Sequence, residues 1–250
     1  MKISVMWMTR GRSHELIYSF ASFVNKADDN KNIEYFFALD PDDTQSFEGL
    51  NKVQSMAIVH DAEINALVMN ERYGYAELEQ YQNAVGQVFT GECLFILNDD
   101  LLCLSQGWDT SLRKTIEPYQ NEPRWIGMAP LNERNKSIVT FVGINRTWYN
   151  VVGRVSGTRA ADGYLRIVGD KAGIPPLVFD VDLVHLQRGR QKIGYTTSDG
   201  ETKLFPGLPD DGAGGYHTEN RIPPKYEFEK GIGKERIRED VQRLKNWRKQ

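Results

Sequence analysis

The sequence predicts an α/β fold in which a mostly parallel central sheet carries helices on both faces, followed by a C-terminal extension that ends in a helix. Short apolar runs alternate along the chain with segments whose apolar residues recur at helical spacing. The apolar run 94–97 is typical of a strand buried on both faces, as in parallel sheets covered by helices. A chain of 250 residues, of which 40% are hydrophobic, is long enough to bury a sizeable core.

The first hundred residues alternate between strands and helices. Ser13 is expected to cap a helix with apolar residues at helical spacing, and another helix is expected at about 77–89. This βαβ order predicts parallel strands. The expected strands are 3–8, 33–39, 55–59 and 94–97.

The rest of the chain is less regular. Residues 194–216 are rich in glycine, proline and acids, which is typical of a mobile loop or lid. The segment 234–250 has a helical apolar pattern with basic residues between. It either docks on the body, which we favour, or contacts phosphate backbones or lipids. The other expected elements are a helix at 108–119, a strand at 125–130, a strand with a packing segment at 138–149, and a partly alternating strand at 177–185.

Composition limits the classes of partner. The formal charge of -3 offers no global attraction to nucleic acid or to an anionic membrane. Cys93 and Cys103 are too few for a disulfide framework or a zinc cluster, and we expect reduced, buried thiols. The apolar start at 1–8 is followed too soon by Arg10 and Arg12 for a signal peptide or a membrane span, so we expect a cytoplasmic location.

Two adjacent carboxylates, Asp99 and Asp100, directly follow the buried strand. Ligands of open α/β sheets bind at the carboxyl ends of the strands. Two acids placed there repel each other unless a cation or a shared proton relieves them. A divalent metal that carries a phosphate-bearing substrate is the simplest relief, and a turn with solvated acids is the alternative.

Several motifs in register resemble a known family. In chain order they are Val5-Met6-Trp7-Met8-Thr9-Arg10-Gly11-Arg12, a strand ending in Asp40, Arg72-Tyr73-Gly74 before a helix with Asn83, Gly91-Glu92, Leu97-Asn98-Asp99-Asp100, and Gly107-Trp108. This order resembles the GT-A glycosyltransferases, most closely family-2-like members, with a phage type as one variant. The resemblance covers about 3–112 and returns weakly at 161–165 and 180–185. It implies a GT-A-like catalytic domain at 1–193, with a nucleotide-sugar half (1–112) and an acceptor half (113–193), followed by the extension 194–250.

The resemblance implies a metal site. Asp100 matches the last acid of the family's DxD motif and would ligate Mn²⁺ or Mg²⁺. His185 looks like the family's C-terminal metal ligand, and His217 competes for that role. Asn98 stands where the motif usually has its first acid, which puts a contact to ribose or metal there in doubt. Asp99 would act through water or the ribose.

The resemblance also implies donor and acceptor contacts. Asp162 resembles the acid with which inverting members deprotonate the acceptor hydroxyl, although an N-cap acid is equally well served by its position. The aromatic pair Trp148 and Tyr149 either shapes the acceptor site or belongs to the core. The residues implied to bind the donor are Thr9, Arg10, Arg12, Asp40, Arg72, Asn83, Asn98 and Asp99.

Taken together, the expected function is metal-dependent transfer of a hexosyl or pentosyl group from a nucleotide-sugar to an acceptor hydroxyl. The acceptor is a saccharide, a protein or a modified DNA base. A non-catalytic nucleotide-sugar-binding module is the first alternative, and a metal-dependent hydrolase is the second. The sugar, the nucleotide, the stereochemistry and the oligomeric state stay open.

Overall fold

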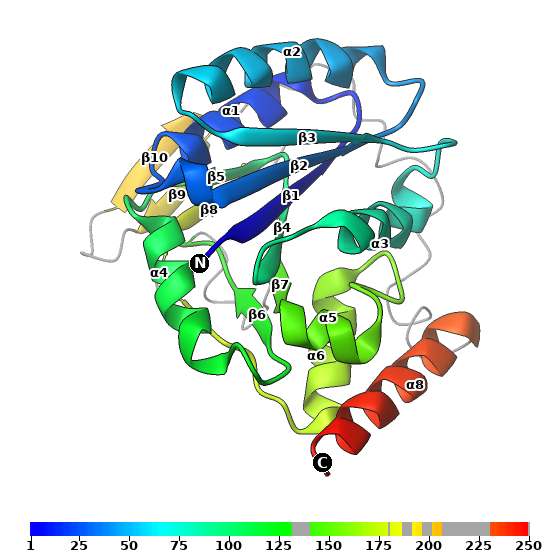
Figure 1. The fold of residues 1–250 in the computed structure, drawn as a ribbon. Coiled ribbons are helices and arrows are strands. Elements are labelled where there is room, and N and C mark those ends of the chain that lie inside the picture. The colour runs from blue at the N-terminus through cyan, green and yellow to red at the C-terminus, as the bar shows by residue number, and fades with distance from the viewer. Residues whose placement is uncertain (132–140, 180, 187–191, 197–201, 207–230, 250) are drawn as a thin grey trace.

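The computed structural model describes residues 1–131, 141–179, 181–186, 192–196, 202–206 and 231–249 (Figure 1). The strands are β1 (Ile3–Thr9), β2 (Ile33–Leu39), β3 (Glu63–Val68), β4 (Cys93–Asn98), β5 (Leu101–Cys103), β6 (Trp125–Met128), β7 (Phe141–Asn145), β8 (Leu183–His185), β9 (Lys192–Thr196) and β10 (Thr202–Pro206). The α-helices are α1 (Ser13–Val24), α2 (Thr44–Val59), α3 (Leu78–Val88), α4 (Trp108–Ile116), α5 (Arg146–Val152), α6 (Ala161–Ala172) and α8 (Gly231–Trp247). Short 3-10 helices span Asn30–Asn32, Tyr75–Glu77 and Glu117–Tyr119.

The central sheet confirms the predicted fold class. Within the described residues its strand order is β3-β2-β1-β4-β7-β6. The pairs among β3, β2, β1 and β4 are parallel, whereas β7 runs antiparallel to both β4 and β6. All four residues of the 94–97 run are buried, as expected of a strand covered on both faces. Consequently, the carboxyl ends of β1, β2 and β4 meet at one edge.

Two layers of helices cover the sheet (Figure 1). Trp7 and Phe37 point to one face, where they pack against α1, α2 and α4. Met6 and Phe36, one position away on the same strands, point to the other face and pack with α3, α5, α6 and α8. This alternation follows from the two-residue period of a strand. Cys93 and Cys103 are buried free thiols, as predicted.

The third strand was wrongly predicted. Residues 55–59 belong to α2, which Asp43 caps by accepting a hydrogen bond from the Ser46 amide. The buried residues of this helix recur every three or four positions, so its inward face is helical. The third strand is β3, which forms an edge of the sheet and buries none of its side chains fully. An edge strand with this exposure gives only a weak apolar signal.

Two expected caps and part of an expected loop also differ from the prediction. Arg12 occupies the N-cap position of α1, and Ser13 is the first helical residue and makes no capping hydrogen bond. Asp162 is the second residue of α6, after the N-cap residue Ala160. The loop expected at 194–216 overlaps β9 and β10, which pair with each other as an antiparallel ribbon. The remaining residues of that loop, 197–201 and 207–216, lie outside the described residues, as does His217.

The C-terminal helix docks on the body, as favoured from its sequence. Ile237 and Leu244 are buried against α5 and α6. The buried Asp240 accepts a hydrogen bond from the Tyr164 hydroxyl. Arg243 donates to the Val152 carbonyl, so part of the basic character is used to hold the helix in place. None of the described helices is both long and apolar enough to cross a membrane.

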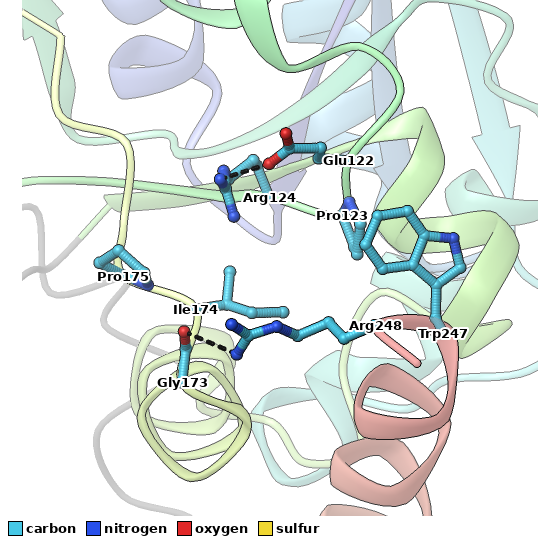
Figure 2. A pocket seen from close by; sticks show the side chains of 8 residues that line it. All are labelled: Glu122, Pro123, Arg124, Gly173, Ile174, Pro175, Trp247 and Arg248. Atoms are coloured by element: carbon cyan, nitrogen blue, oxygen red, sulfur yellow. Dashed lines mark hydrogen bonds and ion pairs between the residues drawn. The ribbon is translucent and has the colours of Figure 1, made fainter. Parts of the chain in front are cut away.

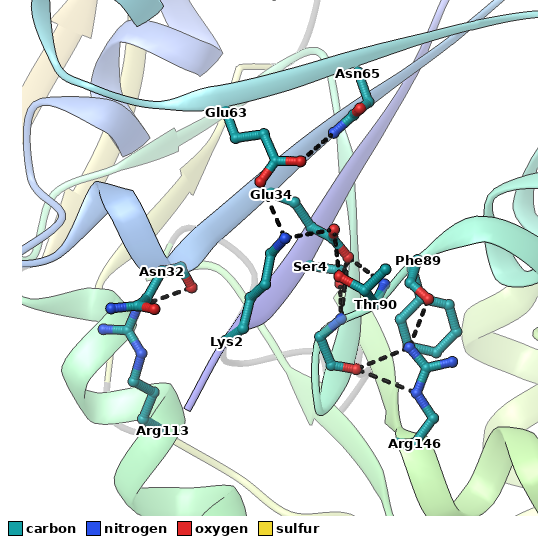
Figure 3. Close-up of polar contacts among 11 residues, drawn as sticks. Lys2, Ser4, Asn32, Glu34, Glu63, Asn65, Phe89, Thr90, Arg113 and Arg146 are labelled. Carbon is teal, nitrogen blue, oxygen red and sulfur yellow. Dashed lines mark hydrogen bonds and ion pairs between the residues drawn. The ribbon is translucent and has the colours of Figure 1, made fainter.

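A buried carboxylate, Glu34, connects the strands at their amino ends, opposite the edge that carries the acids. Figure 3 shows Glu34 of β2 among donors from β1 and from the segment that enters β4. Ser4 donates its hydroxyl, Thr90 donates its amide and its hydroxyl, and the Gly91 amide lies 3.0 Å away. Burial raises the pKa of Glu34, but the hydrogen bonds from Ser4 and Thr90 outweigh it and lower the pKa overall. Glu34 is therefore ionised at neutral pH.

Replacing Glu34 with alanine is expected to destabilise the fold by about 3 kcal/mol, because it leaves buried amide and hydroxyl donors without an acceptor. Since the folded pKa is lowered, this contribution is present above the unfolded pKa and is lost as pH falls through the folded pKa. Lys2 pairs with both Glu34 and Glu63. Glu63 is 51% exposed and is the control, and its loss should cost about 0.5 kcal/mol. Urea unfolding measures both. Equal losses would contradict the structural role of Glu34.

Candidate active site

The carboxyl ends of β1 and β4 form a buried polar cluster. Thr9, the last residue of β1, donates its hydroxyl to Asp99 Oδ2 at 2.8 Å. Arg12, at the start of α1, donates from Nη1 to Asp99 Oδ1 at 2.9 Å and lies 3.5 Å from Asp100 Oδ2. All four residues are buried, with at most 8% of each exposed. The acid pair therefore lies at the sheet edge where the sequence predicts it, and it is not a solvated turn.

A short ribbon brings His185 to the same acids. Asp99 and Asp100 form the turn between β4 and β5, and β5 pairs antiparallel with β8 so that Leu101 lies opposite His185. This register places His185 Nε2 3.2 Å from Asp100 Oδ1. The Leu186 amide donates to the Asp100 carbonyl at 2.6 Å, and the Phe141 ring meets the imidazole edge to face. Residues 85 positions apart therefore share one site.

Arg12 is the cation that the adjacent acids require. Burial raises the pKa of Asp99 to about 6, and the neighbouring Asp100 adds to the rise, while Arg12 and Thr9 oppose it. Burial also raises the pKa of Asp100, but contact with His185 and the charge of Arg12 outweigh it and lower the pKa overall. As the pH falls, Asp99 therefore takes up a proton before Asp100 does.

Replacing Arg12 with alanine is expected to destabilise the protein by about 3 kcal/mol near neutral pH, because it leaves two buried acids without their counter-ion. Their folded pKa values then rise. A carboxyl with a raised folded pKa stabilises below its unfolded pKa and loses that effect as pH rises, so the cost is larger at about pH 8 than at about pH 5. Urea unfolding at both values measures this. A cost that does not depend on pH would contradict the charge role, and exposed Arg166 is the control.

A third carboxylate, Asp40, directly follows β2 at the same edge and is 1% exposed. Arg10 Nη1 donates to its Oδ2 at 2.8 Å, the Tyr73 amide donates to Oδ1 at 3.3 Å, and the Tyr81 hydroxyl donates to Oδ1. Gly74, whose φ of 62° suits glycine, donates its amide to the Tyr81 hydroxyl. Burial and Asp40 raise the pKa of Tyr81, which keeps the phenol protonated.

The sequence analysis missed Tyr81. The feature of the sequence that could have identified it is its position, as a tyrosine on the buried face of the helix that follows the Tyr73-Gly74 turn. The same part of the site includes Asp42, to which Arg10 donates at 2.7 and 3.0 Å, thereby lowering the pKa of that carboxyl. Arg72 is exposed, and its charge contributes a smaller lowering.

Two residues predicted to bind the donor, Asn98 and Asn83, lie in different parts of the structure. Asn98 is the last residue of β4, partly buried and opposite Met8 of β1. Asn83 lies on α3, where its Oδ1 accepts from the amides of Val155 and Ser156 and its Nδ2 donates to the Ser156 carbonyl at 2.8 Å. Its amide thus fixes the segment between α5 and α6 and, through it, the start of α6.

Asp162 lies in the first turn of α6, and the guanidinium of Arg159, just before this helix, lies 5.2 Å from the centroid of the Tyr75 ring, next to the Tyr73-Gly74 turn. At the other end of this helix, the Ile174 carbonyl accepts from the Trp125 indole at 2.9 Å, where β6 begins. A helix of 12 residues is about 18 Å long. Its first turn therefore lies on the side of the Tyr73-Gly74 turn, away from the start of β6. Burial raises the pKa of the half-buried Asp162 carboxyl.

The aromatic pair proposed for the acceptor site separates in the structure. Trp148 is completely buried and belongs to the core cluster of α5, α6 and α8, so it cannot stack on an acceptor. Tyr149 is partly buried and packs edge to face on Phe89, with ring centroids 5.4 Å apart. A tryptophan in an apolar stretch is usually a core residue because of its large buried area.

Asp100 and His185 fit a divalent cation. Asp100 Oδ1 is buried, makes no hydrogen bond and faces His185 Nε2. Carboxylate oxygen and imidazole nitrogen both suit Mn²⁺. Within the described residues, no group of three or more histidine, cysteine or acidic side chains converges as a metal site. The described residues thus offer two ligands, and a phosphate-bearing substrate and waters would supply the others, as is common for Mg²⁺.

The fold defines the class: it is the GT-A-like α/β arrangement of a mostly parallel sheet between helices. Among solved structures it is similar to the mannosyltransferase PcManGT from Pyrobaculum calidifontis, in complex with GDP-Man and Mn²⁺, with a TM-score of 0.58 and 11% identity. That match covers 75% of this chain and 58% of that one, so the chain spans less than two thirds of its neighbour's length. At this identity the likeness shows the fold alone.

Lower similarity is found to S. aureus TarS 1-349 in complex with UDP-GlcNAc, with a TM-score of 0.44 and 16% identity over 54% of this chain and 36% of that chain. No family model and no curated protein sequence matches the chain.

Proposed function

We propose that this chain is a glycosyltransferase that moves a hexosyl or pentosyl group from a nucleotide-sugar donor to an acceptor hydroxyl. The observation that carries the proposal is the cluster of the buried acids Asp99 and Asp100 with the partly buried His185 at the carboxyl edge of the parallel strands. Ligands of open α/β sheets bind at this edge. The neighbour PcManGT, which shares the fold, was solved with GDP-Man and Mn²⁺, and this supports a donor of the same chemical class.

Asp100 and His185 would hold Mn²⁺ or Mg²⁺ in this proposal. When bound, the cation neutralises the donor's diphosphate and the charge that develops on the departing nucleotide. Arg12 and Thr9 hold the Asp99 carboxylate, which would act through water or the ribose. Carboxylates outnumber guanidiniums at this edge, where Asp40, Asp42, Asp99 and Asp100 face Arg10 and Arg12. That excess favours a cation.

The nucleoside would lie against the β1 and β2 ends. Asp40 is held by Arg10, Tyr73 and Tyr81 and would accept from the base or ribose. The exposed Arg72 would approach the base or the diphosphate, since a guanidinium matches two phosphate oxygens at once. Thr9 and Asn98 complete the ribose side, and Asn83 supports the site through the segment that precedes α6.

Asp162 would act as the general base of an inverting transfer. It would accept the proton of the acceptor hydroxyl as that oxygen attacks the anomeric carbon and the nucleotide leaves. Its place in the first turn of α6, on the side of the Tyr73-Gly74 turn, supports this role. Its raised pKa makes it a stronger base than an exposed carboxylate.

The experiment that tests the proposal is thermal stability against a panel of nucleoside diphosphates and their sugars, each with Mn²⁺, Mg²⁺ or EDTA. A ligand at about a hundred times its dissociation constant adds about 2.7 kcal/mol. We expect a metal-dependent increase for one nucleotide, which would define the donor class. If no nucleotide raises the melting temperature with either metal, the nucleotide-sugar site is wrong.

A non-catalytic nucleotide-sugar-binding module is the second candidate, because Asn98 replaces the first acid of the motif and Arg12 already pairs with both remaining acids. It predicts the same stabilisation without consumption of donor. Hydrolysis of the donor to free sugar and nucleoside diphosphate, followed over hours, separates the two: an enzyme of this class turns over slowly with water, whereas a binding module leaves the donor intact.

For the acceptor we propose a saccharide or a protein ahead of a modified DNA base. A DNA acceptor, as in a phage-type enzyme, predicts salt-sensitive binding through the basic segment 234–249. In the structure, however, Arg236, Arg243 and Arg248 of this segment donate to backbone carbonyls of the body. Binding of duplex DNA that weakens steeply between low and moderate salt would reverse this order.

A further inference from the structure

A cavity of about 280 Å³ lies at the opposite edge of the sheet from the acid pair. It is bounded by the entry into β6, the end of α6 and the end of α8 (Figure 2). Trp125 of β6 and Leu94 of β4 both lie level with Ile144 of β7. Asp99 follows Leu94 by five residues, which is about 16 Å along a strand. The cavity is thus separate from the candidate active site.

Two guanidinium groups face this cavity. Figure 2 shows Arg124 and Arg248 on opposite sides of it, with Ile174 between them. Arg248 donates to the carbonyls of Ala172 at 3.1 Å and Gly173 at 3.3 Å, and no carboxylate of the described residues pairs with it. Arg124 pairs with Glu122, a side chain that is 49% exposed. The cavity therefore has more positive than negative charge, in a chain whose net charge is -3.

An aromatic wall completes the cavity. Trp247, near the C-terminal end of α8, lines it together with Pro123. The other four tryptophans, Trp7, Trp108, Trp125 and Trp148, are at most 1% exposed. Trp247 alone is partly accessible, and its indole face suits the apolar face of a ring.

A larger cavity of about 500 Å³ between α5 and α8 lacks this charge. Its arginines are paired with acids: Arg154 with Glu239, Arg243 with Asp240, and Arg236 at 3.7 Å from Glu79. Anion binding there would have to break these pairs, whereas Arg248 pairs with no acid in the described part of the chain.

We propose that the 280 Å³ cavity binds a small phosphate monoester that carries one ring, such as a sugar monophosphate. The fork of donors on each guanidinium matches two phosphate oxygens, and the indole covers the ring. Pockets for drug-sized ligands have volumes of about 300–1,000 Å³, so this cavity suits a ligand of a single ring. The site is independent of the proposed transfer reaction.

The test uses glucose 6-phosphate as the probe and acrylamide quenching of tryptophan fluorescence as the readout. Because Trp247 is the accessible tryptophan, bound probe is expected to reduce quenching of the intact protein. Glucose alone should have no effect, and inorganic phosphate should bind more weakly. Arg248→Ala and Arg124→Ala are each expected to weaken binding about tenfold or more, which is about 1.4 kcal/mol. Arg248→Lys retains the charge without the fork and should fall between.

Three controls locate the effect. Arg166→Ala removes an exposed arginine of α6 and should leave binding unchanged. Trp247→Phe should abolish the fluorescence response while phosphorus NMR still detects bound probe. Asp100→Ala should leave binding unchanged, which separates this site from the donor site. Circular dichroism melts verify that each variant is folded.

The proposal is overturned if millimolar glucose 6-phosphate does not protect Trp247, or if protection persists in both arginine variants. Equal affinity for inorganic phosphate would overturn the assignment of a ring-bearing ligand. Loss of binding in Asp100→Ala would overturn the separate site.

Discussion

Replacing Asp100 with alanine is expected to abolish Mn²⁺-dependent binding of the nucleotide-sugar donor while leaving the fold intact. Asp100 Oδ1 is the buried carboxylate oxygen that faces His185 without a hydrogen bond, so the cation would lose one of the two ligands that the described residues offer. The fold should persist because Arg12 and Thr9 still satisfy Asp99. At about a hundred times the dissociation constant, the stabilisation lost would be about 2.7 kcal/mol.

Thermal melts with donor and Mn²⁺, against the same melts in EDTA, measure the effect. Asp42→Ala is the matched control, since Asp42 is a half-exposed carboxylate at the same edge that pairs with Arg10, whereas His185 pairs with Asp100. It should retain the metal-dependent increase. If Asp100→Ala binds donor in Mn²⁺ as the unaltered protein does, the cation site is not at Asp100.

The sequence predicts those parts of the fold that bury continuous apolar runs. β2 is predicted to the residue, and β1 and β4 to within one or two residues, because their side chains are buried on both faces. β3 is missed because it is an edge strand with partly exposed side chains, and α2 extends over the apolar residues that suggest a strand. Tertiary position, not local propensity, decides these cases.

The candidate site divides in the same way. The acid pair and His185 are predicted, since each follows a recognisable strand. The contacts that hold the acids in place are not predicted from the sequence. Arg12 reaches Asp99 across 87 positions, and Tyr81 reaches Asp40 across 41, distances that no local pattern encodes. The sequence indicates that the acids need a cation, but only the structure shows that a guanidinium already supplies part of that charge.

This counter-ion affects how the site would take a metal. Arg12 holds Asp99 at 2.9 Å but is 3.5 Å from Asp100, so the two acids are not equally neutralised. Asp99 is bound by the protein itself, whereas one oxygen of Asp100 keeps its capacity for a ligand. Asn98, which directly precedes the two acids, adds no negative charge to the same edge. A cation here would therefore depend more on the donor's phosphates.

Replacing Asp162 with asparagine is expected to lower the rate of sugar transfer by about 10² to 10⁴, the usual contribution of a positioned base, and to spare donor binding. Asparagine keeps the size of the side chain but cannot take the acceptor's proton. Because burial raises the pKa of Asp162, the transfer rate of the unaltered protein should rise as pH passes that pKa, and the variant should lack this rise. Single-turnover transfer across pH, once an acceptor is in hand, measures both.

The control lies on the same helix. Asp170, at the opposite end of α6, is 63% exposed and pairs with Arg166 over one turn, so Asp170→Asn should transfer normally. A carboxylate in the first turn of a helix also interacts favourably with the helix dipole, by about 0.3–1 kcal/mol. Loss of that role would change the stability of the protein but not the pH profile of the transfer rate. Near-normal transfer by Asp162→Asn with a lower melting temperature would leave Asp162 with this structural role alone.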